Sequence, residues 1–332
     1  AETAKILDLL YEDIKPLEDS KEPTIPEPPP GPPVLTKEEE FIKILDELPS
    51  ATEITKIVAG EKVKIEQARN IYDKLSLEEK DNIAQDKIEK LINIEKKIQA
   101  LKTPIKSKTK APMRQAQAWA IDKGAHKIFI DAAEDYWKYG ELTGINPEIL
   151  YAQAAKETNY GRYTGQVKPE MNNWAGIKIL DPIGDNTYDH EIFQSQADGV
   201  RAHFNHMGIY CGLDPIGDPH PRWHKTKTAA WAGQINYVED LGGKWAPNPD
   251  YGISIVRDYL NNIYNTSIPK EEDILIALEF SHKVGNLEIE KLEEEDIEDI
   301  VGIVKEYENL NPRQKKLVPA DIKGILELIQ SL

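Results

Sequence analysis

The stretch NPEILYAQAAKETNYG, residues 146–161, carries the start and stop signals of one short helix. Asn146 is of a type that caps helix N-termini, and Pro147 suits the first helical position. Gly161 is of the type that ends helices. On either side, from about residue 112 to 268, the pattern is mostly helical with a glycine- and proline-rich middle. We therefore expect a mainly α fold.

A glutamate lies on the apolar stripe of this helix. The i, i+3, i+4, i+7 spacing of one helix face is followed by Leu150, Gln153, Ala154 and Glu157. Burial and the negative end of the helix dipole both disfavour a carboxylate there, so we expect a raised pKa for Glu157. A carboxylic acid that stays protonated near neutral pH can protonate a glycosidic oxygen. On residue type alone, a surface glutamate near a helix end is the simpler interpretation.

Three motifs, in order along the chain, resemble one enzyme family. Residues 151–161, YAQAAKETNYG, resemble the acid-bearing helix of the endo-β-N-acetylglucosaminidases in glycoside hydrolase family 73. Residues 173–178, NWAGIK, are similar to that family's strand on the cleft floor, and LGGKWA at 241–246 with DYG at 250–252 looks like its late tyrosine motif. The resemblance covers roughly residues 112–266, and the three motifs together are highly specific.

The resemblance implies a lysozyme-like catalytic domain with a small β lobe. The implied reaction cleaves the β-1,4 bond between N-acetylglucosamine and N-acetylmuramic acid in peptidoglycan, with Glu157 as general acid. Sugar clefts need aromatic faces for pyranose rings and amide or backbone partners for hydroxyl and acetamido groups. About half of the aromatic residues near the motifs would be core residues instead. The expected substrate-binding set is Tyr160, Asn173, Trp174, Gly176, Lys178, Tyr237, Trp245 and Tyr251.

A second carboxylate is expected because glycosidases usually employ a pair. Glu191 follows Glu157 in the lobe, where many members of the family carry their second acidic residue. The same lobe also contains Glu170, Asp181, Asp185 and Asp189. A substrate acetamido group can itself act as nucleophile, so the sequence leaves open whether Glu191 is base, stabiliser or spectator.

Two alternative functions use the same motifs. A muramidase or lytic transglycosylase would share the fold and the helical glutamate but cut the other linkage. A wall-binding protein with a decayed catalytic site would keep the fold alone. The intact motif around Glu157 argues against this last alternative.

Helical segments lie on both sides of the expected catalytic domain. Tyr72, Leu75, Ile83, Leu91 and Ile94 recur with an offset of 235 as Tyr307, Leu310, Val318, Leu326 and Ile329, which indicates a repeated helical bundle. Ser76 with Glu79 resembles a capping box that starts a helix in the first copy. The expected order is a helical segment at 1–20, a proline-rich linker at 21–36, a bundle at 37–106, the catalytic domain at 107–268 and a second bundle at 269–332.

Charge and composition exclude several functions. The net charge is −17, which argues against nucleic acid as a partner. Between residues 107 and 267 there are 16 basic and 19 acidic residues, so most of the negative charge lies in the flanking segments. The single cysteine, Cys211, excludes an internal disulfide, and no apolar run is long enough to span a membrane.

We expect no metal and no cofactor. Several potential ligands lie close in sequence, but no His-Glu-x-x-His pattern is present and a lysozyme-like mechanism needs none of them: His203, His206, Cys211, His220 and His224. The chain begins at Ala1 without a basic and apolar leader, as a mature or excised piece of a longer precursor would. The expected partner is peptidoglycan, at a secreted, extracellular or wall-associated location, with the flanking bundles contacting other surface components.

Overall fold

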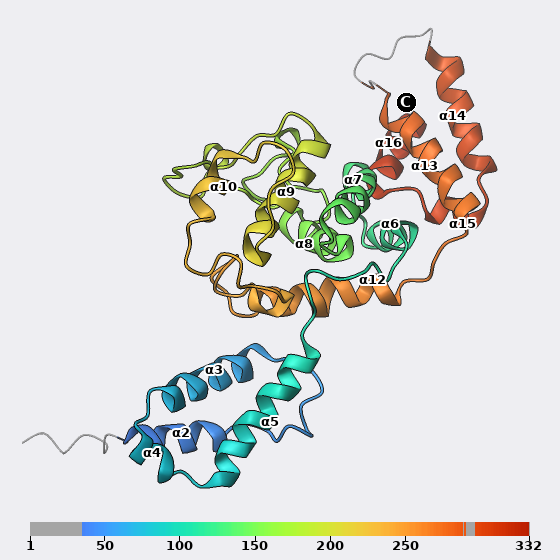
Figure 1. The fold of residues 1–332 in the computed structure, drawn as a ribbon. Coiled ribbons are helices and arrows are strands. Elements are labelled where there is room, and N and C mark those ends of the chain that lie inside the picture. Colours follow the sequence, from blue (N-terminus) through green and yellow to red (C-terminus); the bar gives the residue numbers. More distant parts are fainter. Residues whose placement is uncertain (1–34, 288, 290–295, 332) are drawn as a thin grey trace, which may run out of the picture.

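The computed structural model describes residues 35–287, 289 and 296–331. The segment 1–20 and the proline-rich residues up to 34 lie outside these ranges. Helices make up 62% of the structure and strands 3%, which confirms the mainly α class. Figure 1 shows an N-terminal bundle, a central domain and a C-terminal bundle in that order along the chain.

The N-terminal bundle has a core of its own. Its helices are α2 (Lys37–Asp46), α3 (Ala59–Asp73), α4 (Leu77–Asp81) and α5 (Gln85–Leu101). The capping box predicted at Ser76 and Glu79 is confirmed at the start of α4. The buried side chains form a cluster distinct from that of the central domain, with Phe41, Leu45, Leu91 and Ile94 at most 1% exposed.

The central domain surrounds α8, the helix that bears Glu157. Its longer helices are α6 (Met113–Asp122), α7 (Lys127–Thr143), α8 (Pro147–Thr158) and α9 (Gln196–Cys211). Helix α8 packs against α7 on one side and against the π-helical turn η4 (Ile255–Leu260) on another. The shorter elements are η1 (Pro169–Met171), η2 (Thr187–Asp189), α10 (Pro221–Thr226), η3 (Val238–Asp240), α11 (Tyr251–Ser254) and α12 (Asn261–Asn265).

The expected β lobe is reduced to a short pairing. Lys178 and His190 form one antiparallel bridge, flanked by backbone hydrogen bonds from Ile179 to Asp189 at 3.0 Å and from Glu191 to Ile177 at 2.8 Å. The lobe is therefore held mainly by loop contacts.

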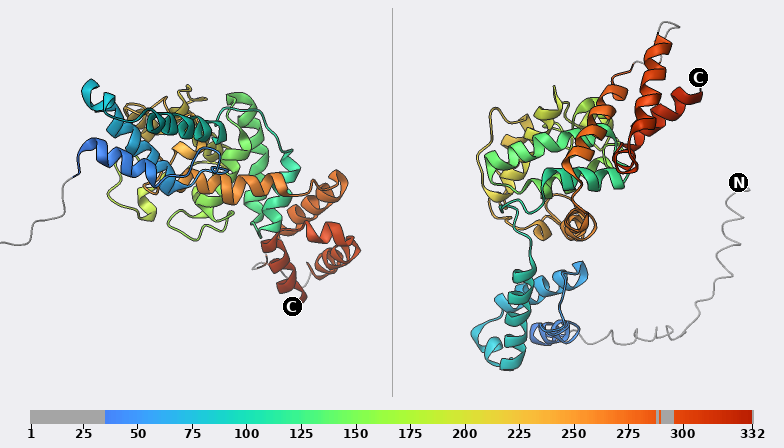
Figure 2. Two further views of the ribbon diagram at one scale, coloured as in Figure 1. Left: turned by 90° about the horizontal axis from the view of Figure 1, so that it is seen from below. Right: turned by 90° about the vertical axis from the view of Figure 1, so that its right-hand side faces the viewer.

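The C-terminal bundle shares its core with the central domain. It comprises α13 (Glu271–Gly285), α14 (Ile297–Asn309), α15 (Pro312–Lys316) and α16 (Ala320–Ser331). Buried side chains of α13 and α16 belong to the same cluster as those of α6 and α7. Figure 2 shows this bundle against the central domain, with the N-terminal bundle on the opposite side of that domain. No helix in the described ranges has the length and hydropathy needed to cross a bilayer.

Candidate active site

Helix α8 is buried on all sides except at its end. Asn146 caps it as expected, since its Oδ1 accepts a hydrogen bond of 2.9 Å from the backbone N–H of Glu148. Every residue from 147 to 155 is buried, so the predicted one-sided apolar stripe is wrong. The helix first reaches solvent at Lys156 and Glu157, and Glu157 is exposed rather than covered.

The last turn of α8 ends earlier than the sequence suggested. Asn159, not Gly161, is the C-cap, with a left-handed φ of 49° that asparagine tolerates. The hydroxyl of Thr158 donates to the carbonyl of Ala154 at 2.7 Å and accepts the N–H of Gly161 at 2.9 Å. This closure fixes the direction in which Glu157 leaves the helix.

The carboxyl of Glu157 is accessible yet largely surrounded by protein. Burial raises its pKa above the ordinary value. This effect outweighs the hydrogen bond from Tyr251, the charge of Lys156 and the hydrogen bond from Trp245, all of which lower the pKa. Glu157 is thus exposed as a residue, while the protein around its carboxyl disfavours the charged form. The predicted direction of the pKa shift is confirmed.

Tyr251 holds one oxygen of this carboxyl. Its hydroxyl donates a short hydrogen bond to Oε1 of Glu157 and accepts one of 2.9 Å from Nε2 of Gln153. The close packing of α11 on η3 places the tyrosine. A Cβ at Gly252 would lie 1.8 Å from the carbonyl oxygen of Val238, so glycine is required there.

The loop that contains Gly176 faces the other oxygen of Glu157. A Cβ at Gly176 would lie 3.8 Å from Oε2, and the φ of +60° at this position favours glycine. Asn173 braces the loop from within, because its Nδ2 donates to the carbonyls of Ile177 at 2.8 Å and Glu191 at 3.0 Å. Its Oδ1 accepts the N–H of Ile177 at 2.9 Å. The buried amide is thus committed to the backbone, which corrects the expectation that Asn173 binds substrate.

The same loop positions Glu191. Its backbone pairs with Ile177, one residue beyond the glycine that faces Glu157. Burial raises the pKa of the Glu191 carboxyl. Its side chain lines a pocket of about 170 Å³ together with Arg201, Asn205, Asp218 and His220.

Two of the expected aromatic contacts lie in or against the core. Trp174 is 2% exposed, and its ring packs on Phe129 and Tyr163 with centroids 6.1 and 5.7 Å apart. A ring this deeply buried has no face for a sugar, so the assignment of Trp174 to the cleft is corrected. Tyr160 is half-buried and stacks on Tyr259 at 5.8 Å.

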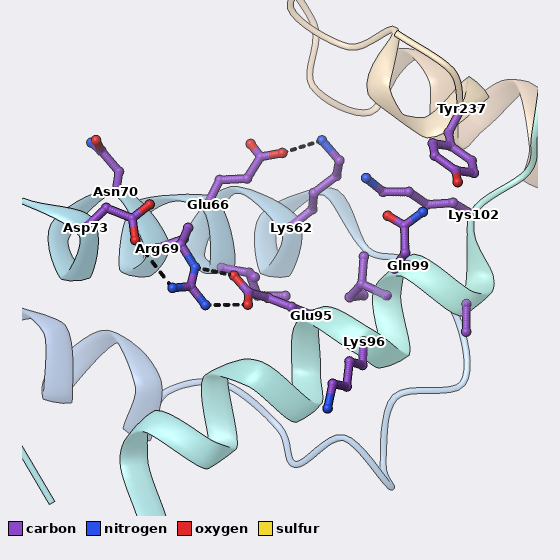
Figure 3. A pocket seen from close by; sticks show the side chains of 13 residues that line it. Lys62, Glu66, Arg69, Asn70, Asp73, Glu95, Lys96, Gln99, Lys102 and Tyr237 are labelled. Carbon is purple, nitrogen blue, oxygen red and sulfur yellow. Dashed lines mark hydrogen bonds and ion pairs between the residues drawn. The ribbon is translucent and has the colours of Figure 1, made fainter. Parts of the chain in front are cut away.

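Lys178 and Tyr237 have other partners. Lys178 donates to the carbonyl of Gly184 at 2.5 Å and pairs with Asp185 at 2.8 Å, which ties down the lobe. Tyr237 lines a groove of about 980 Å³ formed with α3 and α5 (Figure 3), where Nζ of Lys102 lies 5.5 Å from its ring centroid. The structure therefore places Tyr237 at the junction with the N-terminal bundle.

Trp245 connects the site to two histidines of α9, of which His203 is buried. It lies close enough to Glu157 to lower the pKa of that carboxyl, and its ring centroid lies 5.7 Å from that of His203 and 5.1 Å from that of His206. Within the part of the chain that the structure describes, no three or more His, Cys, Asp or Glu side chains form a group that could hold a metal ion. Cys211 is buried, with its thiol 3.5 Å from the carbonyl of Met207.

Comparison with known proteins defines the class of this domain. Residues 133–263 match the glucosaminidase family, described as mannosyl-glycoprotein endo-β-N-acetylglucosaminidase. This segment is therefore a glucosaminidase-family domain, which belongs to the glycoside hydrolases, and the resemblance seen in the motifs is confirmed. At the level of the family, this match supports a glucosaminidase activity that degrades peptidoglycan.

One curated relative is an uncharacterized protein of Borreliella burgdorferi. It is 28% identical over 121 residues, which cover 36% of this chain and 55% of the relative. The chain thus aligns with about half the length of that protein. No solved structure gives a significant match.

Proposed function

We propose that the central domain is an endo-β-N-acetylglucosaminidase of the autolysin type. It cleaves the β-1,4 bond between N-acetylglucosamine and N-acetylmuramic acid in peptidoglycan and acts in the wall or outside the cell. The observation that carries this proposal is the carboxyl of Glu157, which has a raised pKa at an accessible position inside a glucosaminidase-family segment.

Glu157 acts as the general acid in this proposal. A raised pKa keeps its proton available near neutral pH, and that proton passes to the glycosidic oxygen as the C–O bond breaks. Tyr251 occupies Oε1, whereas Oε2 faces Gly176, which has no side chain to obstruct a sugar. Trp245, at the same carboxyl, is the aromatic residue best placed to contact the substrate.

Glu191 is proposed as the second carboxylate, which activates water as a general base. Glu191→Gln should then lower turnover by about 100-fold while leaving the binding of glycan oligomers nearly unchanged. Added azide should restore part of the rate as an external nucleophile. Full activity of the variant, together with inhibition of the wild type by a thiazoline analogue of N-acetylglucosamine, would assign the second role to the substrate acetamido group.

Reducing-end analysis of digested cell walls tests the linkage. Borohydride reduction of the products should give glucosaminitol ends. Muramitol or anhydromuramic ends would instead show a muramidase or a lytic transglycosylase. Failure of the folded full-length chain to release soluble fragments from any wall preparation would favour a binding protein.

A further inference from the structure

A chain of buried hydrogen bonds runs from Glu157 into the core. Beyond the link to Tyr251, Nε2 of Gln153 donates to the Tyr251 hydroxyl at 2.9 Å. Oε1 of Gln153 lies 3.1 Å from Nε2 of His203. Nδ1 of His203 lies 2.9 Å from the hydroxyl of Tyr136. Gln153, His203 and Tyr136 are all 0% exposed.

The inner links of this chain could run in either direction. An amide can flip, a phenol can donate or accept, and a neutral imidazole has one N–H whose position depends on its tautomer. His203 is neutral here, because burial lowers its pKa to about 3. The direction must therefore be decided at the two ends.

The Tyr136 end favours donation toward Glu157 whatever the protonation state of Glu157. Within the described residues, the only hydrogen-bond partner found for the Tyr136 hydroxyl is His203, so the reverse direction would leave a buried O–H without an acceptor. An unsatisfied buried donor is costly. At the other end, Glu157 can only accept when it is ionised, and in its protonated form the direction is set by the Tyr136 end. The satisfied arrangement has Tyr136 donating to Nδ1 of His203, the His203 Nε2–H donating to Gln153, and the Gln153 amide donating to Tyr251.

We propose that Tyr136, His203 and Gln153 form a positioning relay that fixes Tyr251 as a donor to Oε1 of Glu157. The transferable proton must then reside on Oε2, the oxygen that faces Gly176. This inference rests on the proposed role of Glu157 as general acid. It adds that the core residues decide which carboxyl oxygen delivers the proton.

Tyr136→Phe removes one oxygen at the far end of the relay. Without that donor, His203 loses its preference for the Nε2–H tautomer and the chain can reverse. Glu157 then donates from Oε1 to Tyr251, which is unproductive. We expect kcat to fall about tenfold, the effect of one buried hydrogen bond, with KM changed less than about twofold.

The pH profile should move in the same variant. In this variant the Tyr251 hydroxyl is no longer fixed as a donor to the ionised Glu157, so the anion is less stabilised and the pKa of Glu157 rises further. The alkaline limb of kcat therefore moves to higher pH. The other groups around Glu157 are Lys156, Trp245 and Tyr259, and they are unchanged in this variant.

Tyr151→Phe is the matched control. Tyr151 is equally buried, but its hydroxyl donates to the carbonyl of Phe129 at 3.1 Å, outside the relay. This variant should lose comparable stability and keep both the wild-type kcat and the wild-type alkaline limb. Equal kinetic effects in the two variants would reduce Tyr136 to a structural role.

Nitrogen-15 NMR of the histidine-labelled full-length protein tests the relay without any assay of activity. The ring nitrogens of His203 should report the neutral Nε2–H tautomer from pH 5 to pH 8, with the resonance assigned by His203→Phe. The Nδ1–H tautomer in the wild type would overturn the proposal. If wall hydrolysis fails but the Nε2–H tautomer is found, the proposed function is wrong while the direction of the chain stands.

Discussion

The two helical bundles repeat one pattern but join the central domain differently. Shifting α4 (Leu77–Asp81) by 235 positions gives the bounds of α15 (Pro312–Lys316), and α16 begins 235 residues after α5. Four of the five repeated positions are buried in both copies, Leu91 and Leu326, for example, being 1% and 2% exposed, whereas Tyr72 and Tyr307 are partly buried. The predicted repeat is thereby confirmed.

The difference lies in the faces that the bundles turn toward the central domain. The N-terminal bundle has a separate core, and its end is joined through polar contacts: Lys102 to Asp240 at 2.9 Å and Thr103 to Glu239 at 2.8 Å. The C-terminal bundle extends the central core through apolar side chains such as Ile274 and Phe280. One helical pattern can therefore give a separable module or part of a larger core, depending on its outer face.

Matched truncations should separate the two cases most strongly. A chain that ends at residue 268 exposes the apolar surface of α6 and α7 that α13 and α16 cover, so we expect the melting temperature of the catalytic domain to fall by about 10 °C or more. A chain that starts at residue 102 keeps Ile105, which is buried in the central core, and should change by less than about 3 °C. Calorimetry gives the melting temperature of each truncated chain, and wall hydrolysis gives its activity. Equal losses of melting temperature in the two chains would refute the difference between the bundles.

A matched pair of core substitutions gives the next largest effect. The ring of Phe41 is tilted against that of Tyr72, with centroids 5.5 Å apart, and the ring of Phe280 stacks on that of Tyr307, with centroids 5.7 Å apart. Replacement of either by alanine should cost about 3–5 kcal/mol locally. Only Phe280→Ala should shorten the half-life of wall hydrolysis on heating, because only that core continues into the catalytic domain. A comparable loss in Phe41→Ala would mean that the N-terminal bundle is coupled as well.

The polar junction should also respond weakly to pH. Burial raises the pKa of Glu239, an effect larger than the opposing hydrogen bonds from Thr103. A carboxyl whose pKa is higher in the folded chain contributes stability below its ordinary pKa and loses it as the pH rises through the raised value. Glu239→Gln should therefore flatten the pH dependence of the melting temperature between pH 4 and 8. At neutral pH the melting temperature of the variant should be higher than that of the wild type by at most about 3 °C. A melting temperature that falls more steeply with rising pH in the variant than in the wild type would contradict this prediction.

Local signals in the sequence predicted the elements well. Asn146, Pro147 and the Ser76–Glu79 pair each act within a few residues of the chain, and the structure confirms them. Glu157 was singled out for its raised pKa, and that direction also holds.

Contacts between distant segments could not be read in the same way. The motif NWAGIK does not reveal that Trp174 turns into the core while Gly176 turns toward Glu157. The relay joins Gln153 to His203 across 50 positions and to Tyr251 across 98. The local signal of the relay is Gln153, a glutamine within the otherwise apolar stretch 149–155, one turn before Glu157.

The most direct test of the account is the rate of Glu157→Gln on purified peptidoglycan. The variant keeps the shape of the side chain and can still accept the hydrogen bond of Tyr251, but it has no transferable proton. We predict a loss of at least about 100-fold in kcat with an unchanged melting curve. A folded Glu157→Gln protein that hydrolyses peptidoglycan at a rate close to wild type would contradict the assignment of Glu157 as the general acid.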